Sequence, residues 1–164
     1  MKYKIRDMQE SDWEKVSAVY KEGLAEGRST FQKECPSYEA WDKSHLKDCR
    51  YVIMDNNKII GWCSLSATSA REVYKGVVEV SIYISSEFRN KGAGTELLNF
   101  LIEESEKKGY WSLYSAILEV NSPSILLHKK CGFREIGYRE KIAKDIFGVW
   151  QNTILMERRS RKII

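Results

Sequence analysis

Hydrophobic and polar positions repeat along the chain with two different periods, and these periods predict a mixture of strands and helices. In some segments β-branched and aromatic residues run together or alternate with polar ones, as in half-buried strands. The segments 51–55 and 59–67 flank the short turn 56–58 and are predicted to form a hairpin. All predicted strands cover residues 2–8, 51–55, 59–67, 77–84, 110–120, 132–143 and 148–159.

Apolar residues recur at helical spacing in the intervening segments, so these are predicted to be helices. A Ser11–Glu14 capping box is predicted to open the first helix, and Ser37 to cap the second. The predicted helices cover residues 9–24, 36–48, 94–108 and 122–131, with 67–76 as a loop. This order indicates a mixed α/β protein with helices on both faces of a central sheet.

Composition places the chain among ordinary globular proteins and predicts one domain, residues 1–164. Of its 164 residues, 43% are hydrophobic and 30% are charged, and no repeat or flexible linker interrupts them. We find no apolar signal segment and no run of about 20 apolar residues, so we expect a cytoplasmic protein without membrane contact. Four cysteines without a C-x-x-C pair predict reduced thiols and no metal site.

The net charge of +4 is mild, and the basic residues are spread out except in the tail 157–164. We therefore expect no nucleic-acid partner and treat the tail as a solvated terminus. A modest positive balance also suits a protein that handles a small polyanionic cofactor.

The loop Arg89-Asn90-Lys91-Gly92-Ala93-Gly94 separates a predicted strand from a predicted helix, and it has the composition of a phosphate cradle. Its glycines allow close backbone approach, and the first amides of the following helix lack partners and carry partial positive charge. Arg89 and Lys91 would add full charges. The alternative is a tight strand-to-helix turn with ordinary surface charges, and the loop alone does not decide between them.

Several further motifs follow in order along the chain, and together with the loop they carry a family resemblance that indicates the fold. The pattern Arg89-x-x-Gly92-x-Gly94 after a β-branched strand, followed by "NSPSILLHKKCGF", resembles the GNAT superfamily of N-acetyltransferases. The further segments "STFQ", "PSYEAW", "VEVSIYIS" and "GVWQNTILM" are similar to its phosphinothricin and methionine sulfoximine acetyltransferase branch. The resemblance implies an α/β (α+β) GNAT fold, a central mixed and mostly antiparallel sheet with helices on both faces. It also implies acetyl-CoA as donor, no metal, and a homodimer with Trp150 near its interface.

The resemblance also implies which residues hold the cofactor. In the superfamily the backbone of the strand end pairs with the pantetheine arm, and one N–H polarises the thioester carbonyl. The following loop holds the pyrophosphate, and an Asn and a Ser lie beside the arm. An Asn before Pro123 can equally cap a helix. The implied cofactor-binding residues are Ile82, Tyr83, Ile84, Arg89, Asn90, Lys91, Gly92, Ala93, Gly94, Thr95, Asn121 and Ser124.

Two residues are candidates for proton transfer. Glu79 shares a strand face with Ser81 and Tyr83 and matches the branch's catalytic glutamate, so we expect it to act as general base, directly or through water. The alternative is a solvent-facing side chain on a half-exposed strand. His128 stands where the superfamily often has a tyrosine that protonates the leaving thiolate, although a lone histidine on a helix is often structural.

The acceptor is expected to be a small-molecule amine, with Phe31, Arg71 and Lys75 as its binding residues. In the branch an aromatic residue and one or two arginines bind an amino acid's carboxylate and side-chain oxyanion. Here a lysine stands where the branch more often has arginine, which leaves the exact acceptor open. The alternative acceptors are a polyamine, an aminoglycoside or a protein N-terminus, but the positive charges near residues 71–75 favour an acidic acceptor over a cationic one. A catalytically silent CoA-binding module is the non-enzyme alternative. We expect His45 on the surface, and Trp41, Trp62 and Cys131 in the core.

Overall fold

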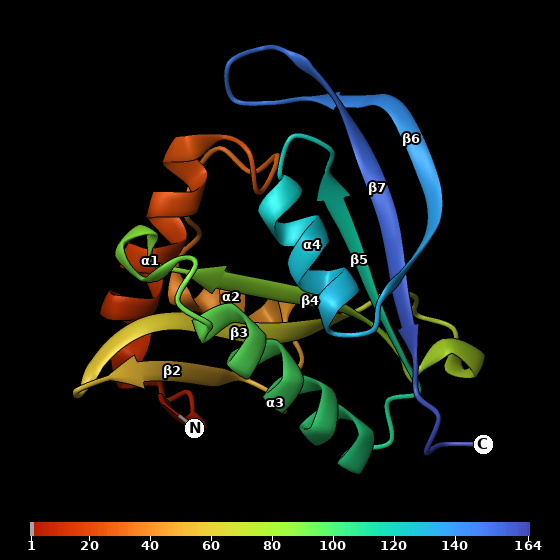
Figure 1. Cartoon of the computed structure of the whole chain (residues 1–164), viewed down its shortest axis with the longest axis horizontal. Coiled ribbons are helices and arrows are strands. Elements are labelled where there is room, and N and C mark those ends of the chain that lie inside the picture. The colour runs from red at the N-terminus through yellow and green to blue at the C-terminus, as the bar shows by residue number, and fades with distance from the viewer. Residues whose placement is uncertain (1) are drawn as a thin grey trace.

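The computed structural model describes residues 2–164 and contains one twisted sheet with four α-helices (Figure 1). The sheet order is β1-β2-β3-β4-β5-β7-β6, and neighbouring strands are antiparallel except β4 and β5. The strands are β1 (Lys4–Asp7), β2 (Tyr51–Asp55), β3 (Lys58–Ala67), β4 (Val77–Ile84), β5 (Ser112–Leu118), β6 (Arg134–Lys144) and β7 (Trp150–Arg159). The helices are α1 (Trp13–Glu26), α2 (Tyr38–Ser44), α3 (Ala93–Lys107) and α4 (Ser122–Lys130). The predicted fold class and element order are confirmed.

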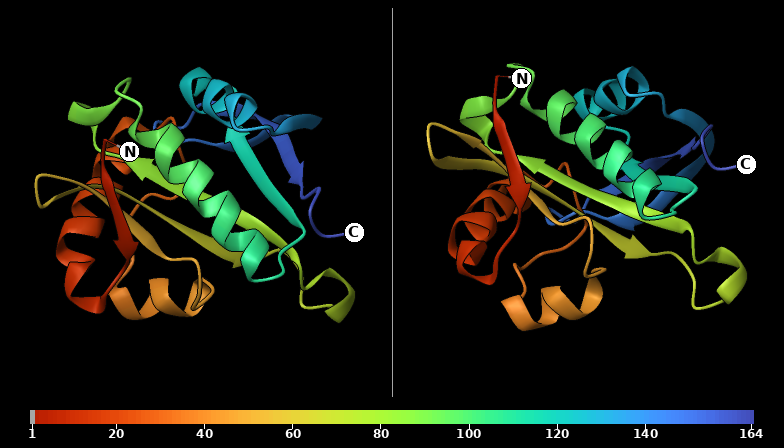
Figure 2. Two further views of the ribbon diagram at one scale, coloured as in Figure 1. Left: turned by 60° about the horizontal axis from the view of Figure 1, so that its bottom comes forward. Right: turned by 90° about the horizontal axis from the view of Figure 1, so that it is seen from below.

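Two hydrophobic layers hold the helices on opposite faces of the sheet. Figure 2 shows α1 and α2 on one face and α3 and α4 on the other. The alternation of side chains along each strand separates the layers, since Val52 and Trp62 pack with α1 and α2 while Ile53 packs with α3. Trp41, Trp62 and Cys131 lie in these layers, as predicted.

The start of α1 differs from the prediction, whereas the start of α2 agrees with it. The predicted Ser11–Glu14 capping box is wrong, because residues Glu10–Asp12 form a short 3-10 turn before α1. Asp12 accepts a hydrogen bond from the Gln9 backbone at 2.8 Å and pairs with Arg6 at 2.7 Å, which lowers the pKa of Asp12. At α2, the Ser37 hydroxyl accepts a hydrogen bond from the Ala40 amide at 3.2 Å, which confirms the predicted cap.

The sheet opens at its centre, between the two parallel strands. β3 pairs with β4 along nearly its whole length, but β5 pairs with β4 only over Val77–Glu79. Beyond Glu79 the strands diverge, as the paths of β4 and β5 in Figure 1 show. Within residues 2–164, the β4 edge from Val80 to Ile84 therefore has no strand partner on its β5 side. We call this opening the seam.

Two further features of the structure are the character of its helices and the state of its cysteines. Across residues 2–164, no helix combines the length and apolar character that a membrane span requires. The four cysteines all carry free thiols, three of them buried.

Candidate active site

Two hollows meet at the seam. One, the central cavity, has a volume of about 320 Å³ and lies among the loop after α1, β4, β5 and α4. The other, the lateral groove, has a volume of about 500 Å³ and lies among α1, the end of β4, the start of α3 and α4. Ser29, Ile82, Tyr83, Asn121 and Ser124 line both hollows. A single elongated molecule can therefore occupy the groove and reach into the cavity.

The lateral groove is shaped by the backbone of the predicted phosphate loop. Gly92 has φ +87° and precedes α3, and it provides no capping side chain for the first helical amides. Those amides give the groove a positive end without a charged residue. A Cβ on Gly92 would meet nothing within 4 Å, so this space is open to a ligand.

Most of the predicted cofactor-binding residues lie along this groove, but two do not. Lys91 and Ala93 are absent from its lining. Ala93 is buried in the core, and the Lys91 ammonium lies 5.4 Å from the centre of the Phe88 ring. The residues that do line it are Ile82, Tyr83, Ile84, Arg89, Asn90, Gly92, Gly94, Thr95, Asn121 and Ser124.

Arg89 is not free in the groove. Its Nη1 atom lies 2.7 Å from Oε1 of Glu26, and this ion pair offsets the charge that the sequence assigned to the loop. Arg28 and Lys130 also line the groove and bring further positive charge. Glu26 and Arg28 were not predicted from the sequence, because nothing in the loop motif points to the end of α1.

Glu79 lies where β4 and β5 separate, and its half-buried side chain lines the central cavity. Burial raises the pKa of this carboxyl. Within residues 2–164 it has no hydrogen-bond or ion-pair partner. A carboxylate that is shielded from water and unpaired inside a cavity is suited to accept a proton from a bound molecule.

His128 is buried and lines the same cavity, and its contacts define its tautomer. Nδ1 lies 2.7 Å from the Ser124 carbonyl oxygen, which can only accept, so Nδ1 carries the proton. Nε2 then accepts from the Ser115 hydroxyl at 3.1 Å. Burial lowers the pKa of His128, which favours the neutral form. A proton exchanged between His128 and the cavity would therefore travel through Ser115, which lines the cavity.

Only one of the three predicted acceptor-binding residues lies in the central cavity. Phe31 lines the central cavity, but Arg71 and Lys75 do not. Both are exposed on the loop before β4, where Arg71 lies over the Tyr74 ring at 5.4 Å and Lys75 pairs with Glu72 at 3.0 Å. Their role in acceptor binding stays a prediction. Among the described residues, Glu79 is the only Asp, Glu, Lys or Arg that lines the cavity.

Several cavity residues were missed by the sequence analysis. Tyr20 donates a hydrogen bond to Gln32, and its ring lies 4.9 Å from that of Tyr83. The prediction that His45 is a surface residue is wrong, because it stacks on Trp41 at 4.4 Å and lines the cavity. Strand alternation could have identified Ser81 beside Glu79, but no local pattern identifies residues from α1 or from the end of α2. The missed residues with a polar side-chain atom are Tyr20, Ser29, Thr30, Gln32, His45, Ser81, Ser115 and Thr153.

The sequence of this chain is similar to those of known proteins. Residues 5–133 match the acetyltransferase (GNAT) family. The chain belongs to the GNAT family. It is an acetyl-CoA-dependent N-acetyltransferase, as the resemblance implied.

Individual members of the GNAT family match nearly the whole chain. A Pseudomonas paraeruginosa L-methionine sulfoximine/L-methionine sulfone acetyltransferase is 25% identical over 163 residues, covering 96% of this chain and 94% of its own. A phosphinothricin N-acetyltransferase from Alcaligenes faecalis is 25% identical over 164 residues, covering 94% and 81%. The structure of a Sinorhizobium meliloti phosphinothricin acetyltransferase in complex with AcCoA is 29% identical, with a TM-score of 0.88 and coverage of 97% and 89%. The recognised branch is confirmed.

Proposed function

We propose that this enzyme moves the acetyl group of acetyl-CoA directly to the α-amine of a small amino acid or analogue, with Glu79 as general base. The acceptors would be of the phosphinothricin, methionine sulfoximine or methionine sulfone type, which are named for its relatives. The observation that carries the proposal is the seam. Within residues 2–164, the unpaired edge of β4 begins directly after Glu79, and the groove and the cavity meet along it.

Each end of acetyl-CoA has a counterpart in this arrangement. The amides at the start of α3, together with Arg28 and Lys130, suit the phosphates in the lateral groove. The pantetheine arm would then follow the open edge of β4 and replace the strand that is missing there. This route carries the thioester toward Glu79, where a backbone N–H of β4 can stabilise the negative charge that develops on its carbonyl oxygen.

The reaction needs one base and one source of a proton. Glu79 takes a proton from the acceptor ammonium, the freed amine forms a C–N bond with the thioester carbon, and the C–S bond breaks. CoA leaves as a thiolate and must be protonated. The nitrogen sheds a second proton as the amide forms. We assign the relay of this proton to Ser115 and His128: the Ser115 hydroxyl passes it to the Nε2 lone pair of His128, and the imidazolium returns it through Ser115 to the thiolate. Asn121 lies where it can both cap α4 and contact the cofactor arm.

A second class of acceptor is favoured by the charge of the central cavity. Because Glu79 is its only Asp, Glu, Lys or Arg among the described residues, the cavity offers no cation to an acceptor's carboxylate. A neutral or cationic amine, such as a polyamine or aminoglycoside, would meet less electrostatic cost there than an acidic one. Neutral donors such as Thr30 and Ser81 would have to bind an acidic acceptor.

The test follows CoA thiol release from acetyl-CoA with a panel of amines. The panel contains phosphinothricin, methionine sulfoximine, methionine sulfone, common amino acids, spermidine and an aminoglycoside. We expect turnover with the amino-acid analogues and none when the amine is omitted. Turnover with only spermidine or the aminoglycoside would replace the first acceptor class by the second, and no turnover with any amine would overturn the proposal.

We further propose that the enzyme is a cytoplasmic homodimer whose two subunits contact each other through the β6–β7 hairpin. Large apolar side chains are exposed along this hairpin, and a second copy would cover them. Light scattering should give twice the mass of one chain, and a monomer mass would contradict the proposal. The exposed residues are Ile136, Tyr138, Ile142, Phe147, Val149 and Trp150.

A further inference from the structure

We propose that His45 binds the acceptor: its Nε2 atom accepts a hydrogen bond from an N–H group on the acceptor's side chain. This would make His45 the residue that distinguishes a sulfoximine, which carries an N–H, from the similarly shaped sulfone, which does not. The inference rests on the proposed amino-acid acetyltransferase function. The supporting observation is the position of His45, which follows the last residue of α2 and lines the central cavity.

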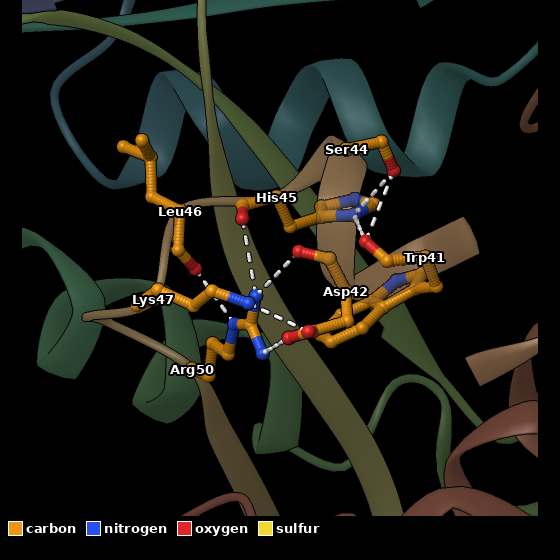
Figure 3. Close-up of polar contacts among 7 residues, drawn as sticks. All are labelled: Trp41, Asp42, Ser44, His45, Leu46, Lys47 and Arg50. Carbon is orange, nitrogen blue, oxygen red and sulfur yellow. Dashed lines mark hydrogen bonds and ion pairs between the residues drawn. The ribbon is translucent and has the colours of Figure 1, made fainter. Parts of the chain in front are cut away.

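The tautomer of His45 follows from its backbone contact. Nδ1 lies 2.7 Å from the Trp41 carbonyl oxygen, as drawn in Figure 3, and a carbonyl oxygen only accepts hydrogen bonds. Nδ1 therefore carries the proton. The Ser44 hydroxyl lies 3.0 Å from the same nitrogen and is also bound to the Trp41 carbonyl oxygen. Nε2 is left with a lone pair and is an acceptor only.

The ring is held firmly, so its lone pair has a defined direction. The imidazole stacks on the Trp41 indole at 4.4 Å with an interplanar angle of 21°. The buried Arg50 guanidinium donates to the His45 carbonyl at 3.0 Å and to Asp42 at 2.6 Å, and it lies 4.8 Å from the Trp41 ring (Figure 3). These contacts fix the backbone of His45 and the indole beneath its ring. A binding group held by packing and hydrogen bonds can discriminate between similar ligands.

The remaining edge of the ring is available to a ligand. One face is covered by Trp41 and Nδ1 is occupied, while Nε2 has no hydrogen-bond partner within residues 2–164. His45 lines the central cavity together with Glu79 and Phe31. Burial lowers the pKa of His45, so the imidazole is neutral at neutral pH. The cavity thus contains a carboxylate for the reacting amine and a separate neutral acceptor for another N–H.

The acceptor chemistry that fits such a pair is a small amino acid whose side chain carries an N–H. Methionine sulfoximine has one oxygen and one N–H on sulfur, whereas methionine sulfone has two oxygens, which accept hydrogen bonds but cannot donate them. An oxygen facing the Nε2 lone pair would leave both groups without a partner. Loss of such a bond predicts that the wild-type enzyme prefers the sulfoximine in kcat/KM by about five- to thirtyfold.

Two substitutions of His45 separate its lone pair from its structural role. His45→Asn keeps a side-chain N–H near the position of Nδ1 and loses the acceptor at Nε2. His45→Gln can place an amide oxygen near the position of Nε2. We expect His45→Asn to reduce the sulfoximine-to-sulfone preference to about one and His45→Gln to retain a preference of at least about threefold. Lys47→Gln, an exposed neighbour of His45, is the control and should leave the preference unchanged.

The measurements are kcat and KM for both acceptors in all four proteins, with the KM for acetyl-CoA and the melting temperature alongside. A change confined to the acceptor KM supports direct contact, because a purely structural defect would also alter the melting temperature and affect both acceptors equally. An unchanged preference in His45→Asn, or no preference in the wild type, overturns the inference while the acetyltransferase activity stands. Absence of turnover with every amine would instead overturn the proposed function.

Discussion

The lateral groove and the central cavity lie side by side, but they are built in different ways. The groove has α1 and α4 as walls, but one of its ends is formed by a continuous stretch, the end of β4 and the loop Arg89–Gly94, which presents backbone amides. The cavity gathers side chains from α1, the end of α2, β4, β5, α4 and β7. A backbone site needs few particular side chains, whereas a side-chain site can change its ligand with single substitutions. The groove therefore suits a fixed cofactor and the cavity a variable acceptor.

Glu79 belongs to the cavity and should give the largest effect of any single substitution. Glu79→Gln keeps the size of the side chain but removes the base, so we expect kcat/KM for the acceptor to fall by about 10²- to 10⁴-fold. The dissociation constant of acetyl-CoA should not change, because the groove is intact. Steady-state kinetics and calorimetric titration measure the two quantities.

The pH dependence adds a second test of Glu79. A general base must be ionised, so activity is lost as the pH falls through its pKa. Because burial raises the pKa of Glu79, we expect this acidic limb above the ordinary glutamate pKa of about 4.3. The limb should disappear in Glu79→Gln. A variant with wild-type kcat, or with the same acidic limb, would show that another group takes the proton.

The same difference explains what could be predicted from the sequence. The element order, Ser37 as a cap and the position of the glycine loop between β4 and α3 depend on local periods and turn residues, and these were predicted correctly. The capping box at Ser11 failed because Arg6, from the neighbouring strand, holds Asp12. His45 was missed because its place depends on Trp41 and Arg50 packing together, a contact that no period in the sequence reports.

Residues of the groove allow a matched comparison at two glycines. Gly92 and Gly109 lie next to opposite ends of α3 with φ values of +87° and +88°, and an added Cβ meets nothing at either position. Alanine at either position should cost about 1–2 kcal/mol of backbone strain. Of these two glycines, Gly92 lines the groove and Gly109 does not. If the loop moves to relieve the strain, Gly92→Ala should raise the dissociation constant of acetyl-CoA by about five- to thirtyfold.

Gly109→Ala serves as the control for that experiment. It should lower the free energy of unfolding by a similar amount and leave acetyl-CoA binding unchanged. Chemical denaturation and calorimetric titration of both variants provide the comparison. Equal effects of the two substitutions on acetyl-CoA binding would mean that helix stability, and not the shape of the loop, controls the groove.

Ser115 tests whether His128 acts on the reaction. Ser115→Ala removes the hydroxyl that links His128 Nε2 to the cavity. If the proton for the thiolate passes through this pair, kcat should fall by about two- to tenfold, the usual worth of one hydrogen bond, with acetyl-CoA binding unchanged. A lower melting temperature with unchanged kcat would instead assign His128 a structural role.

The smallest effect is expected from the loop before β4. Arg71 and Lys75 are exposed and their charged groups contact Tyr74 and Glu72, outside the cavity of their own chain. If the acceptor contacts only the cavity of one chain, replacing both by glutamine changes the acceptor KM by less than about twofold, as for surface substitutions generally. Kinetics with phosphinothricin, the most acidic acceptor of the panel, give the most sensitive measurement. A much larger increase in KM would show that these cations do reach the acceptor. Since they lie outside the cavity within one chain, that result would indicate that the cavity is completed by a movement of the loop or by a second copy.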